Sequence, residues 1–284
     1  MKVLGTIKEL REELTTTKIG LVPTMGYLHS GHLSLIKKAR GENELVVVSI
    51  FVNPTQFGPG EDYAVYPRDL ERDKELAREA GADLIFAPTA EEMYPEGFCT
   101  SVQVEGLTGR LCGISRPTHF QGVTTVVSKL FNIVRPQRAY FGQKDAQQAL
   151  VLQRMVRDLN FPLEIRTAPI IREPDGLALS SRNTYLEPGE RQVAPVLYQS
   201  LLAAKAAFAK GERDGKKIRE AALGVLATEP SVVVDYLVLA HPLTLEDVQI
   251  VENQALLAAA VRIGKVRLID NVMLGRGLVA WEED

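Results

Sequence analysis

The stretch of sequence that decides the fold is IGLVPTMGYLHSGHLSLIKKARGENELVVVSIFV, residues 19–52. It begins with a short apolar run at residues 19–23, which is typical of a buried strand. Apolar side chains then recur at helical spacing over residues 32–40. Residues 45–52 are rich in valine and isoleucine and apolar on both faces, as the central strands of parallel sheets are. The stretch therefore predicts a strand, a polar turn, a helix and a second strand.

The same alternation continues along the chain. We expect further helices at residues 70–80, 122–134 and 146–159, and further strands at residues 83–87, 138–141 and 163–168. Later residues change in pattern, with helical stretches at 188–210 and 216–227 and strands at 232–239, 258–263 and 266–274. This order predicts an α/β protein with a doubly wound, Rossmann-like parallel sheet in residues 1–171 and a second, smaller α+β domain in residues 172–284.

Composition excludes several classes of protein. The chain has 284 residues, of which 45% are hydrophobic and 24% charged, with a formal net charge of −3. This charge argues against a protein that coats nucleic acid or an anionic membrane. The longest apolar run, residues 45–52, is too short to span a bilayer, and the first residues contain no apolar leader. We therefore expect a soluble, cytoplasmic protein, with Cys99 and Cys112 as free thiols and no structural zinc.

The turn PTMGYLHSGH, residues 23–32, contains two of the chain's four histidines. It lies where the first predicted helix begins. A helix N-terminus offers unbonded N–H groups and the positive end of the helix dipole, both of which suit a phosphate group. His29 and His32 could donate further hydrogen bonds, and Gly31 would let a flat base approach the backbone. Two incidental histidines at a helix start are the alternative reading.

Other polar stretches also follow predicted strands, where ligands bind in open α/β sheets. Asn53 and Gln56 lie in FVNPTQF, Arg116 and His119 in RPTHFQGV, Lys144, Asp145 and Gln148 in FGQKDAQQ, and hydroxyls and a guanidinium in LALSSRN. Taken singly, each is weak. A simple Asn–Pro turn explains FVNPTQF better than a binding role does, and Asp145 could merely cap a helix. The chain has no P-loop, and residues 275–280 fit G-x-G-x-x-A only where no room remains for the helix that this motif opens.

Taken together and in this order, PTMGYLHSGH, FVNPTQF, RPTHFQGV, FGQKDAQQ and LALSSRN resemble the pantothenate synthetase (pantoate–β-alanine ligase) family, within the HIGH-type nucleotidyltransferase superfamily. The first block resembles the HxGH signature. LSSRN stands where related synthetases carry a KMSKS loop. One departure is Gln143, where the family often has glutamate.

The resemblance implies a two-step reaction with ATP as a substrate and Mg²⁺ as its companion. The carboxylate of (R)-pantoate attacks the α-phosphate of ATP to give pantoyl adenylate and pyrophosphate. The amine of β-alanine then displaces AMP to give pantothenate. A homodimer, with no nucleic acid or membrane as partner, is also implied.

The resemblance also implies roles for particular residues. His32 would donate a proton to the phosphates, and His29, Lys144 and Arg182 would make the site locally basic. The expected ATP contacts are Met25, Gly26, Tyr27, Leu28, His29, Ser30, Gly31, His32, Gly142, Gln143, Lys144, Asp145, Ile171, Leu179, Ser180, Ser181 and Arg182. Gln56 and Gln148 would hold pantoate, with Asn53, Arg116 and His119 nearby. Asp73 is a candidate for an indirect contact to the metal ion, and residues 180–182 would close over the phosphates.

Three alternatives remain at this point. A nucleotidyltransferase of the same superfamily would stop at an adenylated product and need no amine. A non-catalytic α/β protein would bind ATP without substrate-dependent AMP release. A tRNA-linked synthetase fits less well, because the chain has no sizeable anticodon-binding appendage and no basic face.

Overall fold

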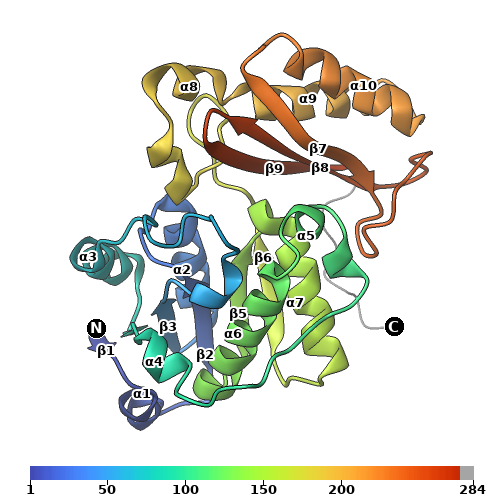
Figure 1. The fold of residues 1–284 in the computed structure, drawn as a ribbon. Helices are drawn as coiled ribbons and strands as arrows, with labels where there is room; N and C mark the ends of the chain where they lie inside the picture. Colours follow the sequence, from blue (N-terminus) through green and yellow to red (C-terminus); the bar gives the residue numbers. More distant parts are fainter. Residues whose placement is uncertain (276–284) are drawn as a thin grey trace. The chain divides into compact units, whose positions relative to one another are not determined.

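The computed structural model describes residues 1–275, and the chain divides into two compact units (Figure 1). The first unit comprises Met1–Gly142 and Gln147–Pro169. The second comprises Gln143–Ala146 and the chain from Ile170 onward. Most of the rejected motif at residues 275–280 lies outside the described residues.

The first unit is built on a six-stranded parallel sheet, which confirms the predicted doubly wound class. Its strands are β1 (Lys2–Leu4), β2 (Ile19–Thr24), β3 (Leu45–Ile50), β4 (Leu84–Phe86), β5 (Arg138–Gly142) and β6 (Glu164–Ala168), in the order β1-β4-β3-β2-β5-β6. Because β2 pairs with both β3 and β5, the order of the strands reverses beside it. The turn after β2 therefore lies at the topological switch point, where doubly wound sheets bind ligands.

Helices cover this sheet on both faces. They are α1 (Ile7–Glu13), α2 (Ser30–Glu42), α3 (Leu70–Ala80), α4 (Ala90–Met93), α5 (Cys112–Ser115), α6 (His119–Val134) and α7 (Ala146–Asp158), with short 3-10 turns η1 (Pro54–Gln56), η2 (Leu107–Gly109) and η3 (Gln143–Asp145). Val22 and Val48 are buried with Ile36 of α2 and Ala77 of α3. Successive side chains of a strand point to opposite faces of the sheet, so Val47 faces away from Val48. Because Val47 is equally buried, the second face of the sheet is covered as well.

The second unit is a three-stranded antiparallel sheet with helices along one face, as Figure 1 shows. Its elements are η4 (Ser181–Tyr185), α8 (Pro188–Val193), α9 (Val196–Ala209), α10 (Gly215–Leu226), β7 (Val232–Ala240), β8 (Ala255–Ile263) and β9 (Val266–Leu274), and the strand order is β7-β8-β9. Leu201 of α9 and Ile218 of α10 are buried with Leu257 and Ala259 of β8. The predicted α+β character of this part is confirmed.

Several predicted elements need correction. The sequence analysis missed β1 and α1, although Thr6 and Glu9 form a capping box at the start of α1. The predicted helix at 188–210 is two helices, because Pro195 has no N–H with which to continue the first. Helix α6 begins one turn earlier than predicted, with Gly122 N bonded to Thr118 O.

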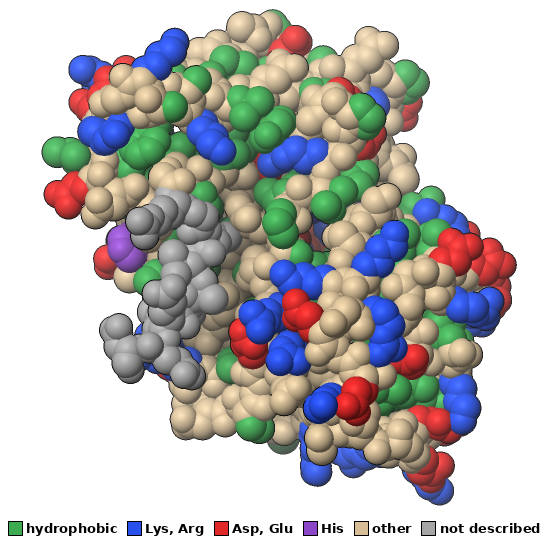
Figure 2. Space-filling model, turned by 180° about the vertical axis from the view of Figure 1, so that it is seen from behind, with side chains coloured by type: hydrophobic (Ala, Val, Ile, Leu, Met, Phe, Trp, Pro, Cys, Tyr) green, Lys and Arg blue, Asp and Glu red, His purple; other side chains and the backbone are tan. Residues whose placement is uncertain are grey.

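Three observations bear on the class of protein. Among residues 1–275, no helix combines the length and the apolar character needed to cross a membrane. On the face drawn in Figure 2, lysine and arginine side chains are interspersed with aspartate and glutamate. Cys99 is exposed and Cys112 is buried, and no disulfide joins these two described residues.

Candidate active site

The turn between β2 and α2 is sharp because two consecutive residues adopt left-handed backbone conformations. Gly26 has φ +84° and Tyr27 has φ +50°. Thr24 Oγ1 accepts a hydrogen bond from Gly26 N (3.1 Å) and donates one to Ser49 O (2.7 Å), which ties the turn to β3. A Cβ atom on Gly26 would lie 2.9 Å from Ile50 Cγ2, so glycine is needed for both conformation and space.

Asp73, in the first turn of α3, holds the other side of this turn. Its carboxylate accepts hydrogen bonds from Tyr27 N (2.7 Å) and Leu28 N (2.6 Å). The residue is only 1% exposed. Burial raises its pKa, although these two hydrogen bonds and the charge of Arg72 act to lower it. These contacts favour a role in fixing the turn over the predicted contact to a metal ion.

His29 and His32 form the N-terminal cap of α2. His29 Nδ1 accepts a hydrogen bond from Gly31 N (3.1 Å), and His32 Nδ1 accepts one from His29 N (3.4 Å). The two ring centroids are 4.1 Å apart. A neutral imidazole that accepts at Nδ1 carries its hydrogen on Nε2. The local backbone therefore makes both Nε2 atoms donors, which suits a phosphoryl oxygen.

A buried asparagine connects the motifs that contain Met25 and Gln56. Asn53 is 1% exposed, and its Nδ2 donates to Gln56 Oε1 (3.2 Å) and to Gly122 O (3.1 Å). Its Oδ1 accepts from Tyr94 OH (2.7 Å). Gln56 Nε2 in turn lies 3.0 Å from Met25 Sδ. The structure thus brings the predicted pantoate residue Gln56 beside the first motif, and Asn53 fixes the orientation of its amide.

Arg116 and His119 lie against the backbone of η1. Arg116 donates to Gln56 O (3.2 Å), and His119 Nδ1 is 2.9 Å from the same oxygen. Arg116 also forms an ion pair with Glu61, with two contacts of 2.5 and 2.7 Å. Burial acts to raise the pKa of Glu61, but the hydrogen bond and charge of Arg116, together with Gly58 N and the charge of His119, lower it overall. The charge of Arg116 is therefore already balanced by Glu61, a residue that the sequence analysis missed.

Gln148 lies in the first turn of α7, where it is half-buried. Its neighbour Gln147 is buried and accepts a hydrogen bond from Cys112 N (3.0 Å). Gln147 also donates to Leu107 O (2.8 Å) and Arg110 O (2.7 Å). Gln147 therefore anchors the loop at residues 107–112. Its neighbour Gln148 is the residue predicted to bind pantoate.

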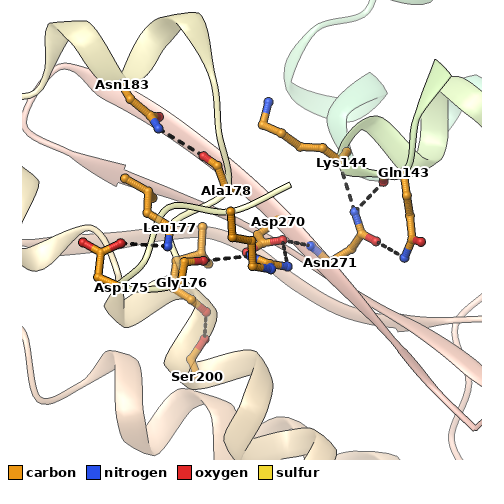
Figure 3. A network of polar contacts seen from close by, with 12 residues as sticks. Gln143, Lys144, Asp175, Gly176, Leu177, Ala178, Asn183, Ser200, Asp270 and Asn271 are labelled. Carbon is orange, nitrogen blue, oxygen red and sulfur yellow. Dashed lines mark hydrogen bonds and ion pairs between the residues drawn. The ribbon is translucent and has the colours of Figure 1, made fainter. Parts of the chain in front are cut away.

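The segment from Gln143 to Asp145 follows Gly142 at the end of β5 and is held by a residue that the sequence analysis did not identify. Asn271 of β9 donates from Nδ2 to Gln143 O (2.9 Å) and Lys144 O (3.1 Å), as Figure 3 shows. No local pattern in the sequence pointed to this asparagine, because it lies more than a hundred residues from both partners.

The segment that contains the predicted phosphate clamp forms a tight loop. Leu179 N donates to Ile171 O (3.0 Å), which brings these two predicted ATP contacts together. Ser180 caps η4 by accepting a hydrogen bond from Arg182 N (3.3 Å), and Ser181 is buried. Arg182 is thereby placed at the start of the 3-10 turn η4.

Comparison with known proteins now identifies the family. The sequence model described as "Pantoate-beta-alanine ligase" matches residues 2–273. The chain belongs to the pantoate–β-alanine ligase family. It is therefore an enzyme, an ATP-dependent ligase of pantoate and β-alanine, as the resemblance of its five motifs implied.

Members of this ligase family resemble the chain over nearly its whole length. The pantothenate synthetase of Acetivibrio thermocellus is 56% identical over 279 residues, which cover 96% of this chain and 99% of the relative. A crystal structure of the pantothenate synthetase of Thermus thermophilus matches with a TM-score of 0.95 and 55% identity, covering 97% of this chain and all of that one.

A third match is a ligand complex. The pantoate–β-alanine ligase of Francisella tularensis, complexed with beta-gamma ATP and β-alanine, has a TM-score of 0.79 and 34% identity to this ligase. The match covers 98% of this chain and 100% of that chain.

Proposed function

We propose that this ligase works in two half-reactions, with the turn at residues 25–32 as its phosphate site. In the first, a carboxylate oxygen of (R)-pantoate attacks the α-phosphorus of ATP, and pyrophosphate leaves. In the second, the amine of β-alanine attacks the acyl carbon, AMP leaves, and the amine loses a proton. The observation that carries this proposal is the histidine-capped start of α2, located at the switch point of the parallel sheet.

The physical requirement of the first half-reaction is to stabilise two anions in one place. The start of α2 supplies the positive end of a helix dipole. The Nε2 atoms of His29 and His32 add donors that are already oriented by their Nδ1 hydrogen bonds. Such preorganised donors, aimed at charge that develops on a phosphoryl group, are commonly the largest catalytic contribution. We assign His32 as the proton donor to the phosphates.

We assign pantoate to the amides of Gln56 and Gln148. A neutral amide can bond the hydroxyl and carboxyl groups of pantoate without neutralising the attacking carboxylate. The contacts around Gln56 support this assignment, because Asn53, Arg116 and His119 hold its side chain and backbone. In this proposal these three residues act chiefly by positioning Gln56.

The predicted domain roles are retained as part of the proposal. Residues 1–171 would bind ATP and pantoate, and residues 172–284 would carry the loop of Ser180, Ser181 and Arg182 that closes over the phosphates. Lys144 and Arg182 would supply cations for the triphosphate. Closure would protect the adenylate from hydrolysis.

Mg²⁺ enters the proposal only as a companion of ATP. Within residues 1–275, no group of three or more histidine, cysteine, aspartate or glutamate side chains could hold a metal ion. Both oxygens of Asp73 already accept backbone hydrogen bonds. The ion would therefore be held by phosphate oxygens and water, as Mg²⁺ commonly is, and we derive no step through it.

We also propose that the ligase is a cytoplasmic homodimer, which the resemblance to its family implies. Sedimentation velocity at several concentrations tests the oligomeric state. A species of twice the chain mass at all concentrations supports the dimer, and a monomer throughout contradicts it. Cell fractionation tests the compartment.

The half-reactions are tested by isotope exchange between pyrophosphate and ATP. With Mg²⁺ and (R)-pantoate present and β-alanine absent, we expect exchange, followed by AMP release when β-alanine is added. Exchange without β-alanine-dependent AMP release would instead indicate a nucleotidyltransferase that stops at the adenylate. Absence of AMP with all three substrates and folded protein would refute the proposal.

The role of His32 is tested by His32→Ala. We expect normal folding and a fall in kcat of about 10²-fold or more, the loss typical of a removed charge-stabilising donor. His241→Ala is the matched control, because His241 is an exposed histidine whose Nδ1 accepts hydrogen bonds from Leu243 N and Thr244 N in its own loop. Near-normal turnover of His32→Ala would remove His32 from its assigned role.

A further inference from the structure

Asn271 of β9 is a buried residue whose side chain bonds the Lys144 segment. It is 3% exposed. Its Nδ2 donates to the consecutive carbonyl oxygens of Gln143 and Lys144 at 2.9 and 3.1 Å, and its Oδ1 accepts from Gln143 Nε2 at 3.3 Å. Figure 3 shows these contacts on one side of the segment, with the Lys144 side chain extending away from Asn271.

The chemistry of these contacts requires an amide at position 271. Both hydrogens of Nδ2 are used on two adjacent backbone carbonyls of η3, so the side chain fixes the direction of the backbone at Lys144. An aspartate of the same size would place carboxylate oxygens against those carbonyls. An alanine would leave both carbonyls without this donor, and a buried polar group without a partner is costly.

The neighbouring residue, Asp270, anchors the segment that leads to Arg182. Its carboxylate forms a bidentate ion pair with Arg172, at 2.6 and 2.9 Å. Arg172 also donates to Gly176 O (3.0 Å), and its guanidinium lies 3.6 Å from the centroid of the Tyr198 ring. Asp270 Oδ1 accepts from Asn271 N (2.7 Å), which links the two residues.

The charge of Lys144 also acts on Asp270. Burial raises the pKa of Asp270, while Arg172 and the charge of Lys144 act to lower it. Adjacent residues of one strand thus hold two segments that both carry cations assigned to the triphosphate.

We propose that Asn271 is a positioning residue for Lys144, which clamps the backbone of residues 143–144 so that the ammonium group meets the ATP phosphates at one fixed place. This inference rests on the proposed contact between Lys144 and the triphosphate. Asp270 supports it by fixing Arg172, so that β9 serves as a common frame for both cationic segments.

The experiment is a double-mutant cycle in the full-length enzyme with the variants Asn271→Ala, Lys144→Ala and the combination. The measured quantities are kcat and the KM values for ATP and pantoate, with thermal unfolding of each variant. Misplacing a binding group by about 1 Å can cost about 10²-fold, so we expect Asn271→Ala to lower kcat/KM for ATP by roughly 10- to 100-fold. The KM for pantoate should change little.

The cycle separates positioning from general stability. If Asn271 acts through Lys144, adding Asn271→Ala to Lys144→Ala should cost less than about 3-fold more, because coupled residues are not additive. Asn43→Ala is the matched control. Asn43 is 8% exposed and donates to Ala39 O (2.8 Å) and Tyr140 OH (2.6 Å), and none of these three residues is an assigned ATP contact. We expect it to lower the unfolding temperature and leave the KM for ATP unchanged.

Two results would overturn the inference. One is an Asn271→Ala enzyme with wild-type kinetics toward ATP, and the other is a loss that multiplies with that of Lys144→Ala. If Lys144→Ala itself keeps wild-type kinetics toward ATP, the assigned role of Lys144 fails and this inference fails with it. Pantoate-dependent exchange by the wild-type enzyme reports separately on the proposed reaction. Should Asn271→Ala not fold, Asn271→Ser retains one donor and should show a smaller loss of the same kind.

Discussion

Two buried asparagines, one in each unit, each support a residue assigned to a substrate, and they do so over very different distances along the chain. Asn53 in the first unit donates to Gln56, three residues away, and Asn271 in the second unit donates to Lys144, 127 residues away. Both use Nδ2 to bond a backbone carbonyl as well as orienting a glutamine side chain. Asn53 therefore orients a glutamine of its own turn, although it also bonds the distant Gly122, whereas Asn271 reaches the Lys144 segment only through the fold.

The difference shows which part of the site depends on the tertiary fold. The Asn53 cap of η1 needs only the local chain to form its contact with Thr55. The contact of Asn271 exists only once β9 has paired with β8 and lies against η3. Support from a distant strand requires closure of a long loop, which costs conformational entropy before any contact forms. Substitutions at or near Asn53 should therefore affect pantoate kinetics, and substitution of Asn271 should affect ATP kinetics.

The largest expected effect is that of Gly122→Ala, which would displace η1, the turn that carries Gln56, from α6. A Cβ atom at this position would lie 2.3 Å from Thr55 O and 2.6 Å from Gln56 Cα, so α6 and η1 would have to separate. We expect a loss of at least about 3 kcal/mol in the free energy of unfolding, the upper end for overpacked sites, because the clash is with backbone atoms. Denaturant unfolding measures the stability, and the KM for pantoate should rise while the KM for ATP changes less.

Gly224→Ala is the matched control for this substitution. Gly224 lies in α10, and a Cβ atom added there would meet open space, with no described atom beyond the backbone of its own helix within 4 Å. We expect Gly224→Ala to stabilise the protein by roughly 0.5–1 kcal/mol, because alanine favours the helix. Equal stability of Gly122→Ala and the wild type would contradict the close approach of α6 to η1.

The next effect in size is that of Asn53→Ala, which removes the local support itself. The hydrogen bonds of a buried amide would be lost, among them those to Gln56, Gly122 and Tyr94. Leaving such groups unpaired costs about 1–3 kcal/mol of stability. The value of kcat/KM for pantoate should fall by about 10-fold, which is the kinetic equivalent of about 1.4 kcal/mol.

Two conservative variants separate the hydrogen bonds that Asn53 donates from those that it accepts. Asn53→Asp keeps the acceptor for Tyr94 and Thr55 but loses the donors to Gln56 and Gly122. Tyr94→Phe removes only the hydroxyl that donates to Asn53 Oδ1. If the donors orient Gln56, pantoate kinetics should suffer in Asn53→Asp and change little in Tyr94→Phe. The reverse pattern would show that Asn53 does not act through Gln56.

The smallest expected effect concerns a surface support of the second unit, Arg191. It donates to Asp175 (2.6 Å) and Glu173 (2.7 Å), and its hydrogen bond holds the pKa of Asp175 below the ordinary value. A lowered folded pKa stabilises the protein above the unfolded pKa of about 3.9, and the stabilisation is lost as the pH falls through the folded pKa. Because Asp175 is 39% exposed and screened by solvent, we expect Arg191→Ala to cost only about 0.5 kcal/mol at pH 7.

Urea unfolding at pH 7 and at about pH 3, below the unfolded pKa of an aspartate, measures this contribution. The difference in stability between Arg191→Ala and the wild type should shrink at the lower pH. A difference that persists unchanged would show that the ion pair with Asp175 is not its source. In contrast to Arg191→Ala, Asn271→Ala should alter ATP kinetics, which would set the buried support apart from the exposed one.

Much of the fold was predictable because its signals are local. The bounds predicted for the helix at residues 70–80 are those of α3, which has Asp69 as its N-cap and Gly81 in a left-handed C-cap. Strands that are apolar on both faces indicated the parallel sheet. The two missed elements, β1 and α1, are short, and β1 is defined by its pairing with β4 rather than by its own three residues.

The site was predictable only where a motif contains its own contacts. The pair of histidines could be located because both stand in one turn between a predicted strand and a predicted helix, and in the structure both rings bond within that turn. Asp73 was predicted only as an indirect contact to the metal ion, and its hydrogen bonds to Tyr27 and Leu28 became visible only with α3 in place. The sequence did not predict the roles of Glu61, Gln147 and Asn271, because an isolated polar residue does not reveal a partner in another element.

The sequence by itself determined the α/β class, the order of the elements, the polar blocks that follow the strands and, through their resemblance, the family. Periodicity and turn chemistry act over a few residues, so they can be read from one chain. Tertiary structure alone decided that Asn271 bonds the Lys144 segment, that Asn53 also bonds Gly122 and Tyr94, that Arg116 is paired with Glu61, and that residues 143–146 group with the second unit. These facts depend on hydrogen bonds between distant segments, and only the packing of the elements brings their donors and acceptors together.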